Sequence, residues 1–170
     1  MADITIRDAL RSDAAAINDI QNYYVERSTV TFLTAPLTLE ERLKWFDGHS
    51  DAHPVTVALA GETIVGWGSL GTFRSAAAYG RTPELSVYVR HDWHRRGIGA
   101  AVVSDLVKRA RALGHHAIVG CCCSEATASI ALLEALGFAR VGHLPEVGRK
   151  FDRWLDVVFV QKLVEPLTPA

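Results

Sequence analysis

The sequence of 170 residues has only three cysteines, almost no net charge and no long apolar run. A helix that spans a bilayer needs about 20 consecutive apolar residues, so we expect no membrane partner and no spanning segment. A net charge of −1 gives no general attraction to nucleic acid. The short basic stretch at 90–96 is one small cluster, and we expect no nucleic-acid partner.

The three cysteines are adjacent, at Cys121–Cys123. Consecutive cysteines lack the C-x-x-C spacing of metal and redox sites and cannot cross-link distant segments. We therefore expect no metal, and we interpret these residues as small, mostly apolar residues of a strand. Reduced thiols, and an N-terminus without a basic segment followed by an apolar one, favour a cytoplasmic protein. Whether the thiols do more than pack stays open.

The rest of the chain reads as one domain over residues 1–170, without repeats or linkers. Alternating apolar residues predict strands, and apolar residues at helical spacing predict helices. The strands are expected at 4–9, 54–60, 63–73, 84–90, 116–123, 138–144 and 153–163, and the helices at 14–27, 38–49, 99–113 and 125–136. This order predicts a mixed α/β sheet with helices on both faces.

Capping residues mark two of these helices. Thr38 and Glu41 have the spacing of a capping box. Ser124 is expected to cap the helix at 125–136, and Gly137 to end it.

The junction between the strand at 84–90 and the next helix carries two glycines, Gly97 and Gly99, among basic residues. A dinucleotide fingerprint would need a third glycine where Val102 stands, and no Gly-Lys-Ser/Thr follows as in a Walker loop. Glycines let a ligand approach the backbone, and a helix N-terminus favours anions. From these residues alone, two interpretations stay open: a phosphate-binding turn and a solvated basic loop.

Several longer segments carry a family resemblance. Residues 87–89 (VYV) followed by 95–100 (RRGIGA) resemble the acetyl-CoA diphosphate loop of the GNAT N-acetyltransferase superfamily. The segments at 22–42, 84–89, 132–138 and 147–161 are similar to those of phosphinothricin and methionine-sulfone N-acetyltransferases. The resemblance implies a mostly antiparallel central sheet splayed between strands 4 and 5, and a homodimer. It also implies transfer of an acetyl group from acetyl-CoA to the amine of a small amino acid or analogue.

The same resemblance implies a donor site made largely of backbone. The pantetheine arm would pair with the backbone of Val87, Tyr88 and Val89, and the Val89 N–H would also polarise the thioester carbonyl. The diphosphate would be held by backbone N–H groups of Arg95, Arg96, Gly97, Ile98, Gly99 and Ala100.

Acetyl transfer requires a neutral amine, so a base must take a proton from an ammonium group. Glu84 matches the catalytic glutamate of the branch, although an acidic residue on a sheet face can also be merely exposed. For the acceptor, Arg74 offers a planar fork for a carboxylate. Phe32 and Tyr79 offer apolar walls. Ordinary surface or packing roles are the alternative for these three residues.

The chain departs from the family pattern at three positions that concern the donor. His94 stands where the diphosphate loop usually has Gln or Arg, which should weaken binding only modestly because backbone N–H groups do most of it. Ala126 replaces an Asn that usually contacts the cofactor arm, and Leu133 replaces a Tyr or His that often protonates the leaving thiolate. The departures at Ala126 and Leu133 favour the alternative, a non-catalytic acetyl-CoA-binding module. Ala76 and Gly80 replace basic residues of the substrate loop, which leaves the identity of the amine open.

Overall fold

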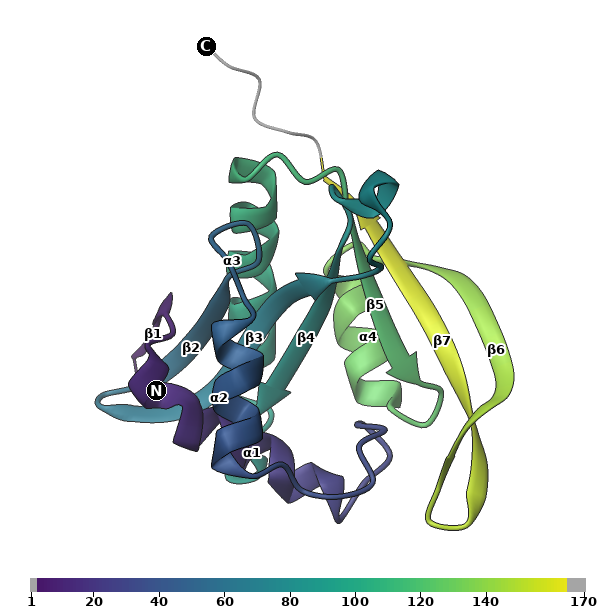
Figure 1. Cartoon of the computed structure of the whole chain (residues 1–170), viewed down its shortest axis with the longest axis horizontal. Coiled ribbons are helices and arrows are strands. Elements are labelled where there is room, and N and C mark those ends of the chain that lie inside the picture. The colour runs from purple at the N-terminus through teal and green to yellow at the C-terminus, as the bar shows by residue number, and fades with distance from the viewer. Residues whose placement is uncertain (1–2, 165–170) are drawn as a thin grey trace.

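The computed structural model describes residues 3–164 as a seven-stranded sheet flanked by four α-helices (Figure 1). The strands are β1 (Ile4–Asp8), β2 (Val55–Ala60), β3 (Thr63–Thr72), β4 (Pro83–Val89), β5 (Ala117–Cys123), β6 (Ala139–Lys150) and β7 (Arg153–Leu163). The helices are α1 (Ala14–Val25), α2 (Leu39–Asp47), α3 (Ile98–Ala112) and α4 (Thr127–Ala135). Short 3₁₀ turns occupy Arg11–Asp13, Ala77–Tyr79 and His91–Trp93.

The strand order in the sheet is β1-β2-β3-β4-β5-β7-β6. Every neighbouring pair is antiparallel except β4 and β5, which are parallel and pair only at Glu84 with Val119 and at Leu85 with Gly120. Beyond these two pairs the strands diverge (Figure 1). The predicted sheet, mostly antiparallel and splayed between strands 4 and 5, is confirmed.

Helices cover both faces of the sheet, as the sequence predicts (Figure 1). On one face α1 packs its buried Ile17 and Ile20 against Trp67 of β3, with part of α2 around them. On the other face α3 packs against β3 and β4, with α4 beside it. Gly68 permits the close approach of α3, because a Cβ there would lie 2.6 Å from Cγ1 of Val102.

Local sequence signals account for most of the element boundaries. The Thr38 hydroxyl accepts from the Glu41 N–H, and the Glu41 carboxylate accepts from the Thr38 N–H, so the predicted capping box is present. Gly137 has a φ of +83°, which only glycine adopts readily, and follows the end of α4.

Two details of the prediction are wrong. Ser124 does not cap α4, because the helix begins two residues later than predicted and Ala126 stands at the N-cap position, without a side-chain cap. The sixth strand runs on to Lys150 rather than ending at residue 144. Its register shifts between Leu144 and Gly148, where Glu146 has a φ of +50°, and this irregularity lets the strand continue past Pro145.

No helix within residues 3–164 is long and apolar enough to cross a membrane.

Candidate active-site cleft

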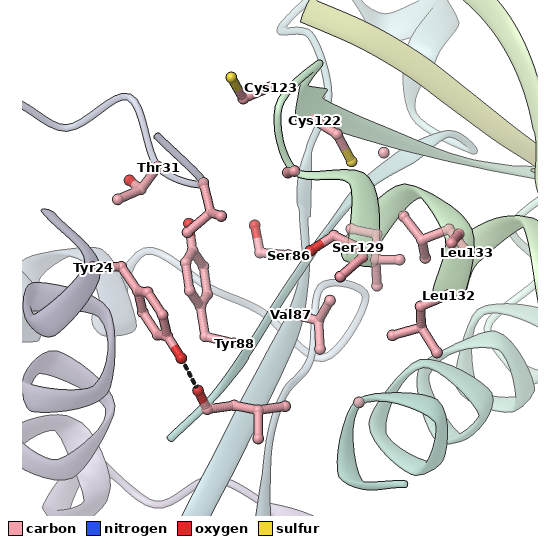
Figure 2. A pocket seen from close by; sticks show the side chains of 18 of the residues that line it. Tyr24, Thr31, Ser86, Val87, Tyr88, Cys122, Cys123, Ser129, Leu132 and Leu133 are labelled. Carbon is pink, nitrogen blue, oxygen red and sulfur yellow. Dashed lines mark hydrogen bonds between the residues drawn. The ribbon is translucent and has the colours of Figure 1, made fainter. Parts of the chain in front are cut away.

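A cleft of about 840 Å³ opens where β4 and β5 separate. Its walls are the divergent parts of these two strands, the turn and first residues of α3, the face of α4 toward the sheet, and the chain after α1 (Figure 2). The lining includes Val87, Tyr88 and Val89 together with Arg95, Gly97, Ile98, Gly99 and Ala100. The fold therefore brings together the strand and the turn that the sequence singles out.

The turn before α3 presents free backbone donors to this cleft. Arg95 and Gly97 have φ values of +63° and +78°, and no heavy atom lies within 4 Å of an ideal Cβ on Gly97. The first bond within the helix runs from the Ala101 N–H to the Gly97 carbonyl, so the N–H groups of residues 98–100 have no partner within the helix. Such a turn suits a diphosphate.

Arg96 lies differently from its neighbours in the turn. Its guanidinium carbon is 4.4 Å from the ring centroid of Trp93, and its side chain is not part of the cleft lining. Only its backbone is available for the role that the family resemblance implies.

Glu84 stands at the closed end of the cleft, where β4 still pairs with β5. It also lines a second, smaller cavity of about 400 Å³ beneath the end of α2, so Glu84 borders both spaces. Burial raises the pKa of the Glu84 carboxyl above its ordinary value. A carboxylate of raised pKa, open to two cavities, is suited to accept a proton on one side and pass it to the other.

The end of β4 is fixed by a tyrosine from α1. The Tyr24 hydroxyl donates to the Val89 carbonyl at 2.5 Å (Figure 2). It also lies 2.6 Å from Nε2 of His94. Burial raises the pKa of Tyr24 to about 12, so the hydroxyl keeps its proton at neutral pH. This contact ties the divergent end of β4 to the turn that precedes α3.

Residues expected to bind the acceptor are only partly brought together. Phe32 lines the cleft, and its ring packs so closely on β6 that a Cβ on Gly148 would lie 2.2 Å from Cε2 of Phe32. Arg74 and Tyr79 line neither cavity. They lie on the exposed loop before β4, with the Arg74 guanidinium carbon 5.3 Å from the Phe73 ring centroid and 5.9 Å from that of Tyr79.

A buried lysine holds the chain after α1 in place. Lys150 is 5% exposed, and its Nζ donates to the carbonyls of Ser28 (2.8 Å) and Thr31 (2.7 Å). These bonds join the β6–β7 hairpin to the segment that carries Phe32, so Lys150 is structural.

Several residues of the cleft wall with a polar or thiol group were not predicted from the sequence, among them Cys121, Cys122, Cys123 and Ser129. Burial raises the pKa of the Cys122 thiol to about 11. Ser129 lies on α4 between Ala126 and Leu133, two positions that the family pattern associates with the donor, and this helical spacing is the signal that could have revealed it. Among the described residues no group of three or more His, Cys, Asp or Glu side chains is placed to hold a metal ion.

Comparison with known proteins matches this geometry to a family. The profile of the Acetyltransferase (GNAT) family matches residues 17–138. The chain is 39% identical to an L-methionine sulfoximine/L-methionine sulfone acetyltransferase of Pseudomonas aeruginosa, over 98% of each chain. It is 35% identical to a phosphinothricin N-acetyltransferase of Streptomyces viridochromogenes, over 98% of this chain and 91% of that one.

A solved structure gives the same result. An acetyltransferase from Salmonella typhimurium, determined with its cofactor acetyl-CoA, superimposes with a TM-score of 0.91 at 34% identity, over 98% of this chain and 96% of that one. The chain belongs to the GNAT acetyltransferase family.

Proposed function

We propose that the protein transfers the acetyl group of acetyl-CoA to the amino group of a small amino acid or amino-acid analogue. The observation that carries this proposal is the cleft between β4 and β5, which joins an unpaired strand edge, a glycine turn with free N–H groups and a half-buried glutamate. The named activities of the relatives, on methionine sulfoximine, methionine sulfone and phosphinothricin, support the same acceptor class.

The donor lies along the cleft in this proposal. Its diphosphate accepts hydrogen bonds from the backbone N–H groups of residues 95–100, and Gly97 leaves room for it because nothing occupies the position of a Cβ. Its pantetheine arm pairs with the free edge of β4 at 87–89, which has no partner in β5. The Val89 N–H polarises the thioester carbonyl as charge develops on its oxygen.

Glu84 is the general base of the reaction. The acceptor arrives mostly as an ammonium ion, since an α-amino group has a pKa of about 7.7–8.0. Glu84 takes one proton, directly or through a water, and the neutral amine attacks the carbonyl carbon. The second cavity, which Glu84 also lines, gives that proton a path away from the donor.

The acceptor side chain is bounded by Phe32 in this proposal, and Arg74 and Tyr79 are assigned to the outer part of the acceptor site. The loop of Arg74 and Tyr79 leads directly into the start of β4, so in this proposal these residues meet the distal group of an acceptor whose amine lies at Glu84. An acceptor carboxylate would then form an ion pair with the planar guanidinium group of Arg74.

We also propose that the protein is a homodimer and acts in the cytoplasm. The edge strand β6 and the start of β7 leave Val141, Val147 and Trp154 more than half exposed, a concentration of apolar surface that a second copy would cover. All three cysteines are free thiols, as a reducing compartment requires. Light scattering at micromolar protein concentration tests the dimer, and a monomer mass would exclude it.

The deciding experiment is product detection by mass spectrometry with acetyl-CoA and a panel of amines. The panel contains phosphinothricin, methionine sulfone, methionine sulfoximine, the common amino acids and polyamines. We expect acetylation of one amino-acid analogue above all others. A second candidate function, a non-catalytic acetyl-CoA-binding module, is favoured by Ala126 and Leu133 and predicts tight acetyl-CoA binding without product from any amine.

A further inference from the structure

The inference concerns the leaving group, and it rests on the proposed acetyl transfer. When the bond between the acetyl carbon and sulfur breaks, the electron pair leaves with the sulfur of CoA. A thiol has a pKa of about 8.5, so the sulfur departs with anionic character at neutral pH. A hydrogen-bond donor at that sulfur stabilises the transition state.

Successive side chains of β4 point to opposite faces of the sheet, so the strand gives the cleft two sides. Tyr88 belongs to the apolar cluster under α1 and α2, and Glu84 and Ser86 share its side of the strand. Leu85 and Val87 belong to the cluster under α3 and α4. Because Glu84 activates the amine, the amine reaches the carbonyl from the first side, and the sulfur departs toward α4.

The wall on the α4 side is mostly apolar. It is formed by Ile98, Ala126, Ala128, Ala131, Leu132 and Leu133. Ser129 is a polar, half-buried residue of this wall, and Figure 2 shows its hydroxyl turned into the cleft, toward Ser86 of β4. The dashed line in Figure 2 is the hydrogen bond from Tyr24 to the Val89 carbonyl, and no hydrogen bond joins Ser129 to the other side chains drawn there.

We propose that the Ser129 hydroxyl donates a hydrogen bond to the CoA sulfur as the carbon–sulfur bond breaks. Ser129 keeps its proton, and the thiolate takes its own proton from water after it leaves. Glu84 and water receive the protons that the amine loses, so each turnover releases one proton in all. Leu133, one helical turn further along the same face, has no proton to offer, which makes Ser129 the donor that α4 supplies.

Two other groups on this wall carry protons, and neither is as well suited. Thr127 is the first residue of α4 and is exposed. Cys122 also lines the cleft, and its thiol is protonated at neutral pH. A thiol is a weak hydrogen-bond donor compared with a hydroxyl, so Cys122 is the weaker candidate.

The test measures kcat and KM with acetyl-CoA and the amine that the wild-type enzyme acetylates best. Ser129→Ala should lower kcat about 10- to 100-fold, the effect of losing a hydrogen bond to a charged group, with KM for both substrates within about twofold of wild type. Ser129→Thr keeps the hydroxyl and should retain most of the activity. Ser104→Ala removes a hydroxyl from α3 outside the cleft lining and should stay within about twofold of wild type, and calorimetry should give unchanged acetyl-CoA affinity for all three variants.

A second donor separates a chemical role from a structural one. The thiol released from 4-nitrothiophenyl acetate is more acidic than CoA and needs less stabilisation as it leaves. The ratio of wild-type to Ser129→Ala kcat/KM should therefore fall toward 1 with this donor. Equal losses with both donors, or a wild-type kcat in Ser129→Ala, would overturn the assignment of Ser129 alone. An inactive wild-type enzyme that binds acetyl-CoA would overturn the proposed function with it.

Discussion

The contact between Phe32 and Gly148 offers a direct test of the acceptor side of the cleft. In Gly148→Ala the new Cβ would lie 2.2 Å from Cε2 and 2.7 Å from Cδ2 of the Phe32 ring. Ordinary contact begins at 3.4 Å, so the ring must retreat by about 1.2 Å or rotate out of its place. Phe32 is 38% exposed and can swing toward solvent, so we expect a stability loss of about 1 kcal/mol, at the low end for overpacking.

The effect on the acceptor should be larger than the effect on the fold. A wall displaced by more than 1 Å loses its contact with a bound side chain, and we expect KM for the amine to rise about tenfold, or about 1.4 kcal/mol. KM for acetyl-CoA should stay within about twofold, because the donor turn lies elsewhere in the cleft. Steady-state kinetics with each substrate varied in turn gives both values, and thermal unfolding gives the stability.

Gly142→Ala is the matched control on the same strand. A Cβ at Gly142 would lie 3.7 Å from Cβ of Phe159, which is ordinary contact. This variant should change neither KM. If Gly148→Ala also leaves the amine KM unchanged, Phe32 does not bound the acceptor and the reasoning is wrong.

Three further predictions concern the base, the donor turn and the fold. Glu84→Gln should lower kcat about 10²- to 10⁴-fold. Because burial raises the pKa of Glu84, the wild-type kcat should fall as the pH drops through that raised value. A variant with the same pH–rate profile as the wild type would contradict this role of Glu84. Gly97→Ala places a side chain at a φ of +78° and should weaken acetyl-CoA binding about tenfold, as measured by calorimetry. Gly114→Ala is the control: its φ is +75°, so the backbone strain is similar, but it lies beyond the far end of α3 and should not affect binding. Asp13→Asn should cost about 2 kcal/mol of unfolding free energy at pH 7, since Asp13 accepts from Arg7 and from the backbone, and the hydrogen bond from Arg7 lowers its pKa. The lowered pKa means that the Asp13 contribution is complete above about pH 5 and is lost as the pH falls through the folded value, so denaturant unfolding at pH 3 should show a smaller difference.

The periodic spacing of apolar residues was sufficient to predict most of the helices and strands. The seventh strand spans residues 153–163 in the structure as in the prediction, because alternation over eleven residues is a strong signal. The start of α4 was misplaced because Ser124 is a good capping residue by type, yet the backbone at Ser124 is still paired with β7, through the bond from its N–H to the Asp156 carbonyl, and the helix begins at Thr127. Such a contact between distant segments is invisible to local propensity.

The candidate site was predictable where it follows a continuous motif and not where it depends on the meeting of distant strands. The donor turn is local, so its residues were found together. The cleft wall depends on Glu84 lying beside Val119, a register that no spacing along the chain specifies. For that reason the thiols of β5 were interpreted as packing residues, although all three line the cleft.

The parallel junction of β4 and β5 also has a mechanical consequence. Within the sheet, two residue pairs connect the four-stranded half to the three-stranded half, and further out the strands β4 and β5 are separated by a cleft of about 840 Å³. A donor that pairs with the free edge of β4 while it contacts α4 would connect the two halves of the sheet across the cleft. Bound acetyl-CoA would then restrict the relative motion of the two halves, so the protein with and without donor would differ in flexibility more than in shape.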